Sequence, residues 1–316
     1  MGSWMSVTLQ YFKALSDRTR LRLAQVLQRY ELSVNELVQL FGMGQSRISR
    51  HLKILADAGL LNWRRDGLWV FYRAAEDGSG KTFLAAVAPF MEEDSAARAD
   101  LDMAVRILED RALKTRQFFN AIAEDWDALN REVLGDFDLA GAVCAAVPAK
   151  CGVAVDLGCG TGMVLERMRL HARELIGVDG SPRMLELARR RFAASGGHDG
   201  GDPQVSLRIG ELEHLPLRDG EAHFACINLV LHHLSEPLPA LREIRRILQP
   251  GGLLLASDFD KHGNEQMRKD YGDRWLGFDE NMLHDMFAGA GFAPRRTMRR
   301  PVGKGLCLLL ALAEAV

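Results

Sequence analysis

The stretch that most constrains the fold is "VAVDLGCGTGMVLERM", from Val153 to Met168. It has the pattern of a buried strand that runs into a glycine-rich turn and then into a helix. A second strand, "ELIGVD", follows and ends at Asp179, an acid 23 residues beyond Asp156. This order predicts an α/β unit that binds a ligand beyond the carboxyl ends of its strands.

The glycine spacing discriminates between two kinds of ligand. Dinucleotide sites use G-x-G-x-x-G to seat a pyrophosphate, whereas this chain has D-x-G-x-G-x-G, with glycines at 158, 160 and 162. The preceding acid, Asp156, is unfavourable beside phosphates but suits the ammonium of an amino acid. Asp179 is placed to accept both hydroxyls of a ribose. The motif therefore favours a nucleoside carrying an amino acid group.

A separate DNA-binding pattern precedes this motif. In "ELSVNELVQLFGMGQSRISRHLKILADAGLL", Glu31 to Leu61, a helix begins at Ser33 with Glu36 in a capping box, and Gly42 and Gly44 supply a turn. A further helix is expected from about Gln45 to Ala58. Its polar faces have the chemistry that reads a major groove, since Gln pairs with adenine and Arg with guanine. The candidate contacts are Gln45, Ser46, Arg47, Ser49, Arg50, His51 and Lys53.

The next segment predicts a β-hairpin. "LLNWRR" and "LWVFYR" are joined by Asp66-Gly67, for which we expect a type I′ turn. Arg64, Arg65 and Arg73 are candidates for phosphate or minor-groove contacts. A helical protein-interaction domain with ordinary surface charge is the alternative.

Charge and composition support this division. Residues 1–78 hold 11 Lys and Arg against 7 Asp and Glu, and the remainder holds 29 against 35, so a basic head precedes an acidic body. A basic head suits a polyanion. No apolar run approaches the roughly 18 residues of a membrane span, so we expect a cytoplasmic protein without membrane contact. The five cysteines form no C-x-x-C pair, and no metal site is expected.

Residues 81–120 predict a helical connector. Pro89 should divide it into a short and a long helix, and Leu101, Val105 and Leu108 form part of an apolar stripe. We expect this stripe to pack against the head or against a second subunit.

Residues 12–73 resemble the winged-helix repressors of the ArsR family. The matching phrases are "LSDRTRLRLAQVL", the two-helix stretch given above and "WVFYR". The resemblance implies a homodimer that presents two recognition helices to an inverted repeat in double-stranded operator DNA. Ser33 and Asn35 stand where arsenic-sensing members carry cysteines, so arsenic sensing at this place is disfavoured.

The body, about residues 118–314, resembles the class I S-adenosylmethionine-dependent methyltransferases. The match continues from the glycine motif through "GELEHLPL", "FACINLVLHHL" and "LREIRRILQPGGLLLASDF". It implies that S-adenosylmethionine or S-adenosylhomocysteine is bound, with Phe118, Phe119 and Trp126 in a lid; packing of these aromatics onto the body is the equal alternative. The residues implied in the adenosyl site are Asp156, Gly158, Gly160, Gly162, Asp179, Gly180, Met184, Glu211, Leu212, Asn228, Phe118 and Trp126.

No catalytic constellation can be read from the sequence. His232 and His233 are weak candidates for a base or a substrate contact, and a local hydrogen-bonding role is favoured for at least one of them. Methyl transfer from a sulfonium needs little acid-base help once the nucleophile is aligned, so this absence decides nothing.

We therefore expect an α/β chain in three parts. These are a winged helix-turn-helix domain at 1–78, a helical connector and dimerisation region at 79–117, and a Rossmann-like methyltransferase domain at 118–316 with a mostly parallel seven-stranded sheet. The fusion resembles ArsR-type regulators of the methyl cycle that respond to S-adenosylhomocysteine, and the expected targets are methyl-cycle or methionine genes. The alternative is an active methyltransferase for an unidentified small molecule, with an autoregulatory winged helix.

Overall fold

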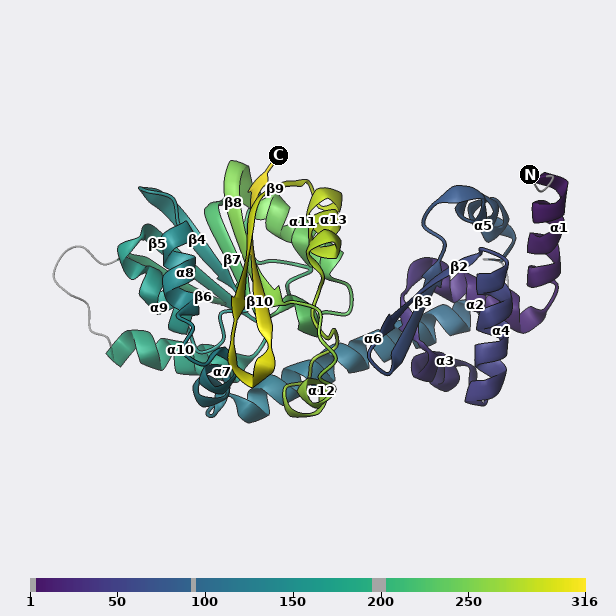
Figure 1. Cartoon of the computed structure of the whole chain (residues 1–316), viewed down its shortest axis with the longest axis horizontal. Coiled ribbons are helices and arrows are strands. Elements are labelled where there is room, and N and C mark those ends of the chain that lie inside the picture. Colours follow the sequence, from purple (N-terminus) through teal and green to yellow (C-terminus); the bar gives the residue numbers. More distant parts are fainter. Residues whose placement is uncertain (1–3, 92–94, 195–202) are drawn as a thin grey trace. The chain divides into compact units, whose positions relative to one another are not determined.

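The computed structural model describes residues 4–91, 95–194 and 203–316. Its contacts divide the chain into a first unit, residues 1–113, and a second unit, residues 114–316, each with its own hydrophobic core. The division falls inside α6 (Ser95–Ile122), a helix of 28 residues. One helix therefore contributes residues to both units (Figure 1).

The first unit is the predicted winged helix. Asp17 accepts a hydrogen bond from the amide of Arg20 and begins α2, while Ser33 and Glu36 form the predicted capping box of α3. Gly42, with φ of 60°, ends α3, so the chain can turn into the next helix. A three-stranded sheet has the order β1-β3-β2. The elements are α1 (Trp4–Leu15), α2 (Arg18–Arg29), β1 (Leu32–Ser33), α3 (Val34–Phe41), α4 (Gln45–Asp57), β2 (Leu61–Asp66), β3 (Trp69–Ala74) and α5 (Gly78–Met91).

The hairpin is present, but its turn is one residue later than predicted. Asp66 pairs with Trp69, so Gly67 and Leu68 are the two central residues. Only Gly67 has positive φ, at 57°, which is the pattern of a type II′ turn and excludes type I′. The reason is that Asp66 is fully buried and belongs to the strand.

The predicted short and long helices of the connector are present as α5 and α6. Pro89 does not end α5, which continues two residues further to Met91. Leu101 and Leu108 of the predicted stripe pack against the core of the first unit, beside the buried Ala104 and Ile107, whereas Val105 is 37% exposed. Charged residues interrupt α6 throughout, and no helix among the described residues combines the length and apolar character needed to cross a membrane.

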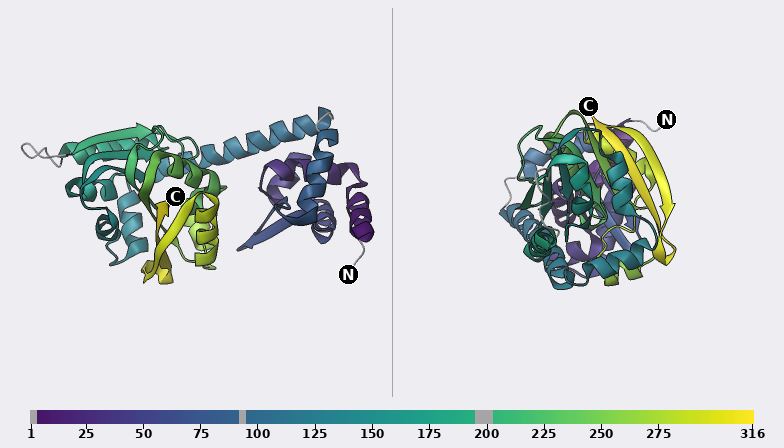
Figure 2. Two further views of the ribbon diagram at one scale, coloured as in Figure 1. Left: turned by 90° about the horizontal axis from the view of Figure 1, so that it is seen from above. Right: turned by 90° about the vertical axis from the view of Figure 1, so that its left-hand side faces the viewer.

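The second unit contains the predicted seven-stranded sheet, in the order β6-β5-β4-β7-β8-β10-β9. All pairs from β6 to β8 are parallel, and β10 pairs antiparallel with both β8 and β9. Figure 2 shows β9 and β10, in yellow, as a long antiparallel pair. The strands are β4 (Cys151–Leu157), β5 (Ala172–Asp179), β6 (Gln204–Ile209), β7 (Ala222–Asn228), β8 (Leu248–Phe259), β9 (Phe292–Pro301) and β10 (Cys307–Ala315).

Helices cover both faces of this sheet, because the strands are apolar on both sides. One core joins the sheet to side chains of α7, α8 and α9, and the other joins it to α11 and α13. Figure 1 shows these two groups on opposite sides of the strands. The helices are α7 (Trp126–Leu134), α8 (Leu139–Ala146), α9 (Met163–Arg167), α10 (Pro182–Ala194), α11 (Pro237–Ile247), α12 (Gln266–Asp270) and α13 (Glu280–Gly289).

Candidate functional site

The glycine-rich turn after β4 places main-chain atoms without flanking side chains at the carboxyl edge of the sheet. Gly158, Gly160 and Gly162 have φ of 70°, 52° and 80°, a region that other residues rarely adopt. A Cβ on Gly158 would lie 2.5 Å from Cγ2 of Val230, so there is no room for a side chain. The turn is a cradle that a ligand can approach closely.

Two acids flank this cradle. Both carboxylate oxygens of Asp179 accept main-chain hydrogen bonds, from Gly160 and Ser181, each at 2.8 Å. These bonds fix the carboxylate and leave lone pairs for ribose hydroxyls. Burial raises the pKa of Asp179.

Asp156 is the more deeply buried acid, with 2% of its surface exposed. Burial raises its pKa to about 7, although the thiol of Cys226 donates a hydrogen bond at 3.3 Å. A buried carboxylate in this state lacks a counter-charge, which a ligand ammonium would supply. The cradle, the fixed Asp179 and this buried acid together fit an adenosyl amino acid.

The aromatic segment for which a lid was one of two expectations borders the glycine turn. A Cβ on Gly160 would lie 3.3 Å from Nε1 of Trp126, so the indole borders the turn. Phe119 makes edge-to-face contacts with Trp126 and with His233, at centroid distances of 5.5 and 4.8 Å. Phe118 contacts Phe119 and lies beside Gly272.

Hydrogen bonds among Asp127, Thr161 and Arg191, which the sequence analysis missed, fix this segment to the glycine turn. The hydroxyl of Thr161 donates to Asp127 at 2.5 Å, and Arg191 donates to the same carboxylate. Arg191 also donates to the main-chain oxygen of Thr161 at 2.9 Å. These residues come from α7, the glycine turn and α10, so no local pattern links them.

The other predicted adenosyl residues occupy varied environments. Met184 is buried beside Gly160, and Gly180 directly follows Asp179. Leu212 is half-buried against the core of the sheet, and Glu211 pairs with Arg116 of α6 at 2.5 Å.

Asn228 ends β7 beside the buried acid. Its side-chain oxygen accepts from Ser257 at 2.8 Å. Its amide nitrogen is buried and meets no acceptor with hydrogen-bond geometry, yet it lies close enough to Asp156 to lower the pKa of that acid. This donor is available to an added acceptor.

The two predicted histidines differ in chemistry. His232 is clamped between carboxylates: Nδ1 lies 2.7 Å from Oδ1 of Asp258, and Nε2 lies 3.5 Å from Oδ1 of Asp273. Burial lowers the pKa of His232, but the two carboxylates raise it by a larger amount, so the pKa is about 9. The two carboxylates therefore favour the charged form of His232.

His233 is neutral. Its Nδ1 lies 3.3 Å from the main-chain oxygen of Gly272, which only accepts, so Nδ1 carries the proton and Nε2 keeps a lone pair. Burial and the charge of His232 lower its pKa well below the ordinary value. Of the two histidines, His233 has the chemistry of a proton acceptor.

Both histidines line a small pocket that is partly open to solvent. The segment after β8 forms one wall of it, with Met267, Tyr271 and Asp273. The walls are otherwise largely apolar, as is typical of small-molecule pockets. The lining residues are Trp126, Leu129, Asn130, Val133, Leu229, His232, His233, Phe259, Met267, Tyr271 and Asp273.

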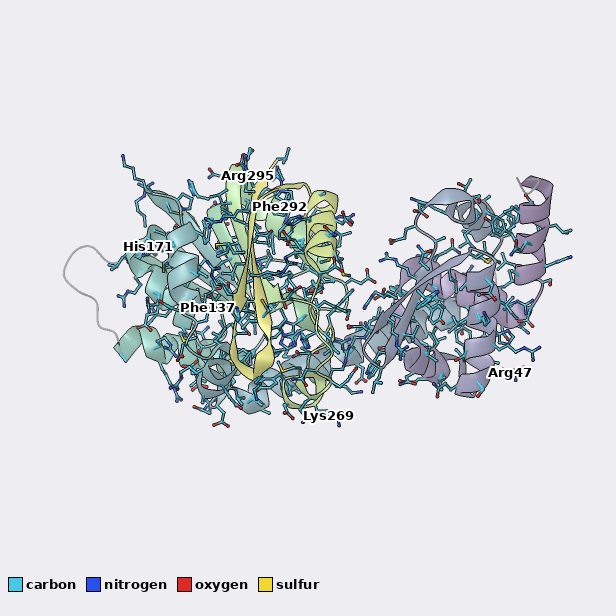
Figure 3. All side chains as sticks on the ribbon, in the orientation of Figure 1. Arg47, Phe137, His171, Lys269, Phe292 and Arg295 are labelled. Atoms are coloured by element: carbon cyan, nitrogen blue, oxygen red, sulfur yellow. The ribbon has the colours of Figure 1, made fainter. Side chains whose placement is uncertain are left out.

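The recognition-helix candidates on α4 divide by exposure. Figure 3 shows Arg47 projecting from the first turn of this helix. His51 lies instead against Asp17, with its side chain 12% exposed, and Lys53 pairs with Asp57 at 3.0 Å. Ser49 is half-buried, and the exposed members of the set are Gln45, Ser46, Arg47, Arg50 and Lys53.

The three predicted wing arginines also differ, and Arg73 pairs with Glu76 at 3.1 Å. Arg64 donates twice to Glu31, at 2.9 and 2.6 Å, and its guanidinium lies over the ring of Phe71. These contacts tie the wing to the start of the helix-turn-helix, so a phosphate would compete with Glu31 for Arg64. Arg65 is exposed and donates to the main-chain oxygen of Gly67.

Comparisons with known proteins match both units. Residues 17–62 match the profile of bacterial regulatory proteins of the arsR family, and residues 155–256 match that of a methyltransferase domain. The ubiquinone/menaquinone biosynthesis C-methyltransferase UbiE of Caulobacter vibrioides is 29% identical over 163 residues, which is 49% of this chain and 64% of that protein. The malonyl-[acyl-carrier protein] O-methyltransferase of Yersinia pestis is 29% identical over 127 residues, 40% of this chain and 42% of its own length.

An uncharacterized 37.1 kDa protein in transposon TN4556 of Streptomyces fradiae is 38% identical over 110 residues, 34% of this chain and 30% of that protein. These three matches each span less than two thirds of the relative's own length.

Solved structures share the fold of the second unit. A chain from the complex of the Haloferax volcanii Trm112 methyltransferase activator has a TM-score of 0.51 at 22% identity, with 62% of this chain and 97% of that chain covered. The [4+2]-cyclase SpnF has a TM-score of 0.54 at 18% identity, with 63% and 94% covered. The chain joins a helix-turn-helix domain of the ArsR family to a class I methyltransferase domain.

Proposed function

We propose that the protein is a DNA-binding transcriptional regulator whose methyltransferase domain is its sensor for S-adenosylhomocysteine or S-adenosylmethionine. The observation that carries this proposal is that α6, one uninterrupted helix, is anchored in both domains. Asp156, Asp179 and the glycine cradle would hold the ligand, which supplies an ammonium, a ribose and an adenine to these groups.

In the first unit, ion pairs tie α6 to the helix-turn-helix. Arg22 of α2 donates to both oxygens of Asp100, at 2.5 and 2.6 Å. Arg111 donates to Glu36, the residue that closes the capping box of α3. Charge on Arg111 lowers the pKa of the half-buried Glu36 despite its desolvation. A change in α6 would therefore act on the helix that precedes the recognition helix.

In the second unit, the last turns of α6 border the adenosyl site. Arg116 pairs with Glu211, and the amide oxygen of Asn120 accepts from the hydroxyl of Ser181 at 2.6 Å. Ser181 in turn donates its main-chain N–H to Asp179. A ligand that engages Asp179 or Glu211 would thus change contacts of the same helix.

Differential affinity for two states of the chain supplies the energy of such a switch. A coupling of about 1 to 3 kcal/mol would change operator affinity by roughly 5- to 150-fold. The proposal includes a homodimer on an inverted repeat, with Gln45, Ser46, Arg47, Arg50 and Lys53 at the DNA, and methyl-cycle or methionine genes as targets.

Fluorescence anisotropy on DNA from the upstream region of the gene tests the proposal at one fixed salt concentration. Titrations are made without ligand, with S-adenosylmethionine and with S-adenosylhomocysteine, and one ligand is expected to change the affinity several-fold. Arg116→Ala should reduce that change, while Arg167→Ala, which removes an exposed pair with Asp138, should preserve it. Tight DNA binding that ignores both ligands would exclude the sensor.

The second candidate is an active methyltransferase for a small molecule, with an autoregulatory winged helix. Its support is the pocket lined by neutral His233, which is suited to accept a proton from an attacking hydroxyl or similar nucleophile. SpnF shares the fold and is named for cyclisation, so the fold alone does not imply methyl transfer. Transfer of labelled methyl groups from S-adenosylmethionine into small-molecule extracts tests this candidate, and no transfer at all would exclude it.

A further inference from the structure

We propose that His232, His233 and Asp273 form a binding site for a divalent metal ion, of the zinc type, at the wall of the pocket. One ligand atom from each residue lies within 4.8 Å of the others, and all three residues are buried. In the parts of the chain that the structure describes, no other group of three histidine, cysteine or carboxylate side chains comes together in this way. This inference is independent of the proposed regulation.

The geometry suits a four-coordinate ion. Nε2 of His232 and Oδ1 of Asp273 are 3.5 Å apart. With metal–ligand bonds of about 2.1 Å, that separation corresponds to an angle of roughly 110° at the metal, close to tetrahedral. The full set, within 4.8 Å, needs to draw together by about 1 Å to complete the site.

The surroundings of both histidines are those of metal ligands. Nδ1 of His232 is bonded to Asp258 at 2.7 Å, and Asp258 is itself fixed by the main-chain N–H groups of His232 and Phe259. Nδ1 of His233 is bonded to the main-chain oxygen of Gly272. Carboxylate and carbonyl partners of this kind orient imidazole ligands and set which nitrogen faces the metal.

The set of donors also points to the class of ion. Two imidazoles and one carboxylate match the three protein ligands of open zinc sites, whose fourth position takes water or substrate. A divalent cation would balance the charges of the two carboxylates, Asp258 and Asp273, that flank His232. The ion would border the pocket, where its open position could accept an oxygen of a bound small molecule.

Titration of the whole chain, first stripped with a chelator, tests the site with Zn²⁺ by calorimetry and with Co²⁺ by visible absorption. One equivalent of Zn²⁺ should bind, and Co²⁺ should give the intense absorption of a four-coordinate site. His233→Ala and Asp273→Asn should each weaken binding at least 10-fold, and Asp258→Asn by about 10- to 100-fold. His171→Ala removes an exposed histidine, labelled in Figure 3, and should change nothing.

Circular dichroism and thermal unfolding check that each variant is folded. If a variant fails this check, the absorption of Co²⁺ in the unchanged chain decides, since it reports the coordination directly. The proposal is overturned if neither Zn²⁺ nor Co²⁺ binds saturably at one equivalent per chain. Binding that His233→Ala and Asp273→Asn leave intact in the folded state overturns it as well.

Discussion

Replacing Asp156 with asparagine should stabilise the ligand-free chain while abolishing its response to an adenosyl ligand. The carboxyl is fully buried and its pKa is raised from 3.8 to about 7, chiefly by loss of solvation. Keeping it charged in the folded state therefore costs about 4 kcal/mol, as an order of magnitude. Asparagine has nearly the same shape and no charge to desolvate.

The pH dependence fixes the sign of this effect. The folded chain binds a proton at Asp156 that the unfolded chain has already lost, so its contribution to stability falls as pH rises from about 4 to about 7. Of the cost of about 4 kcal/mol, roughly 2 to 3 kcal/mol develops between pH 5 and pH 8. Asp156→Asn should therefore stabilise the chain more at pH 8 than at pH 5.

Urea unfolding of the whole chain at pH 5 and pH 8 measures this difference, with Asp285→Asn, an exposed carboxylate of α13, as the control. Added S-adenosylhomocysteine should raise the midpoint of the unchanged chain at pH 8 and leave that of Asp156→Asn unmoved. An equal effect of the substitution at both pH values would refute the reasoning from burial. A ligand response that survives in the variant would refute the role of Asp156 as the partner of the ammonium.

Arg47→Ala should weaken operator binding and, if Arg47 contacts a phosphate, reduce the slope of log affinity against log salt concentration by about 1. Arg173→Ala removes an exposed arginine of the second unit and should change neither quantity. Anisotropy at several salt concentrations measures both. Gly160→Ala places a side chain at φ of 52° against Trp126, so thermal unfolding should show a loss of stability of roughly 1 to 3 kcal/mol. Calorimetry should show a loss of adenosyl binding. An unaltered unfolding midpoint would contradict the strain. Ser33→Ala removes the capping box of α3 and should cost about 1 kcal/mol in chemical unfolding, with no change in adenosyl affinity.

Local chemistry was readable from the sequence. The glycine motif predicted the turn after β4 because positive φ and close approach are properties of single residues. The capping box at Ser33 and Glu36 was predictable because its partners are three residues apart. The seven-stranded sheet followed from a resemblance that spans all its motifs, and the structure confirms it.

Predictions were wrong where the position of a residue in the finished fold decides the outcome. Asp66 reads as a turn residue but is buried in β2, which moves the turn to Gly67 and Leu68. Pro89 reads as a break but lies in the last turn of α5. Val105 follows the apolar stripe of α6 yet is exposed, because the buried face of the helix runs through Ala97, Ala104 and Ile107 instead.

Contacts between distant segments left no sequence signal at all. Hydrogen bonds among Asp127, Thr161 and Arg191 join three elements that are distant in sequence. His232 contacts Asp258 and Asp273 only after the sheet has formed. The adenosyl and DNA-contact residues given by resemblance remain predictions, for which the structure supplies environments.

The strand order of the sheet also has a consequence for synthesis on the ribosome. β9 is made before β10 but pairs only with β10, which inserts between it and β8. Until residues 307–315 have emerged, β8 lacks a neighbour on one side and the arginine-rich β9 has no strand to join. A chain that stalls or is cut before residue 307 would therefore lose two strands rather than one, and would expose an apolar edge of β8 to other nascent chains.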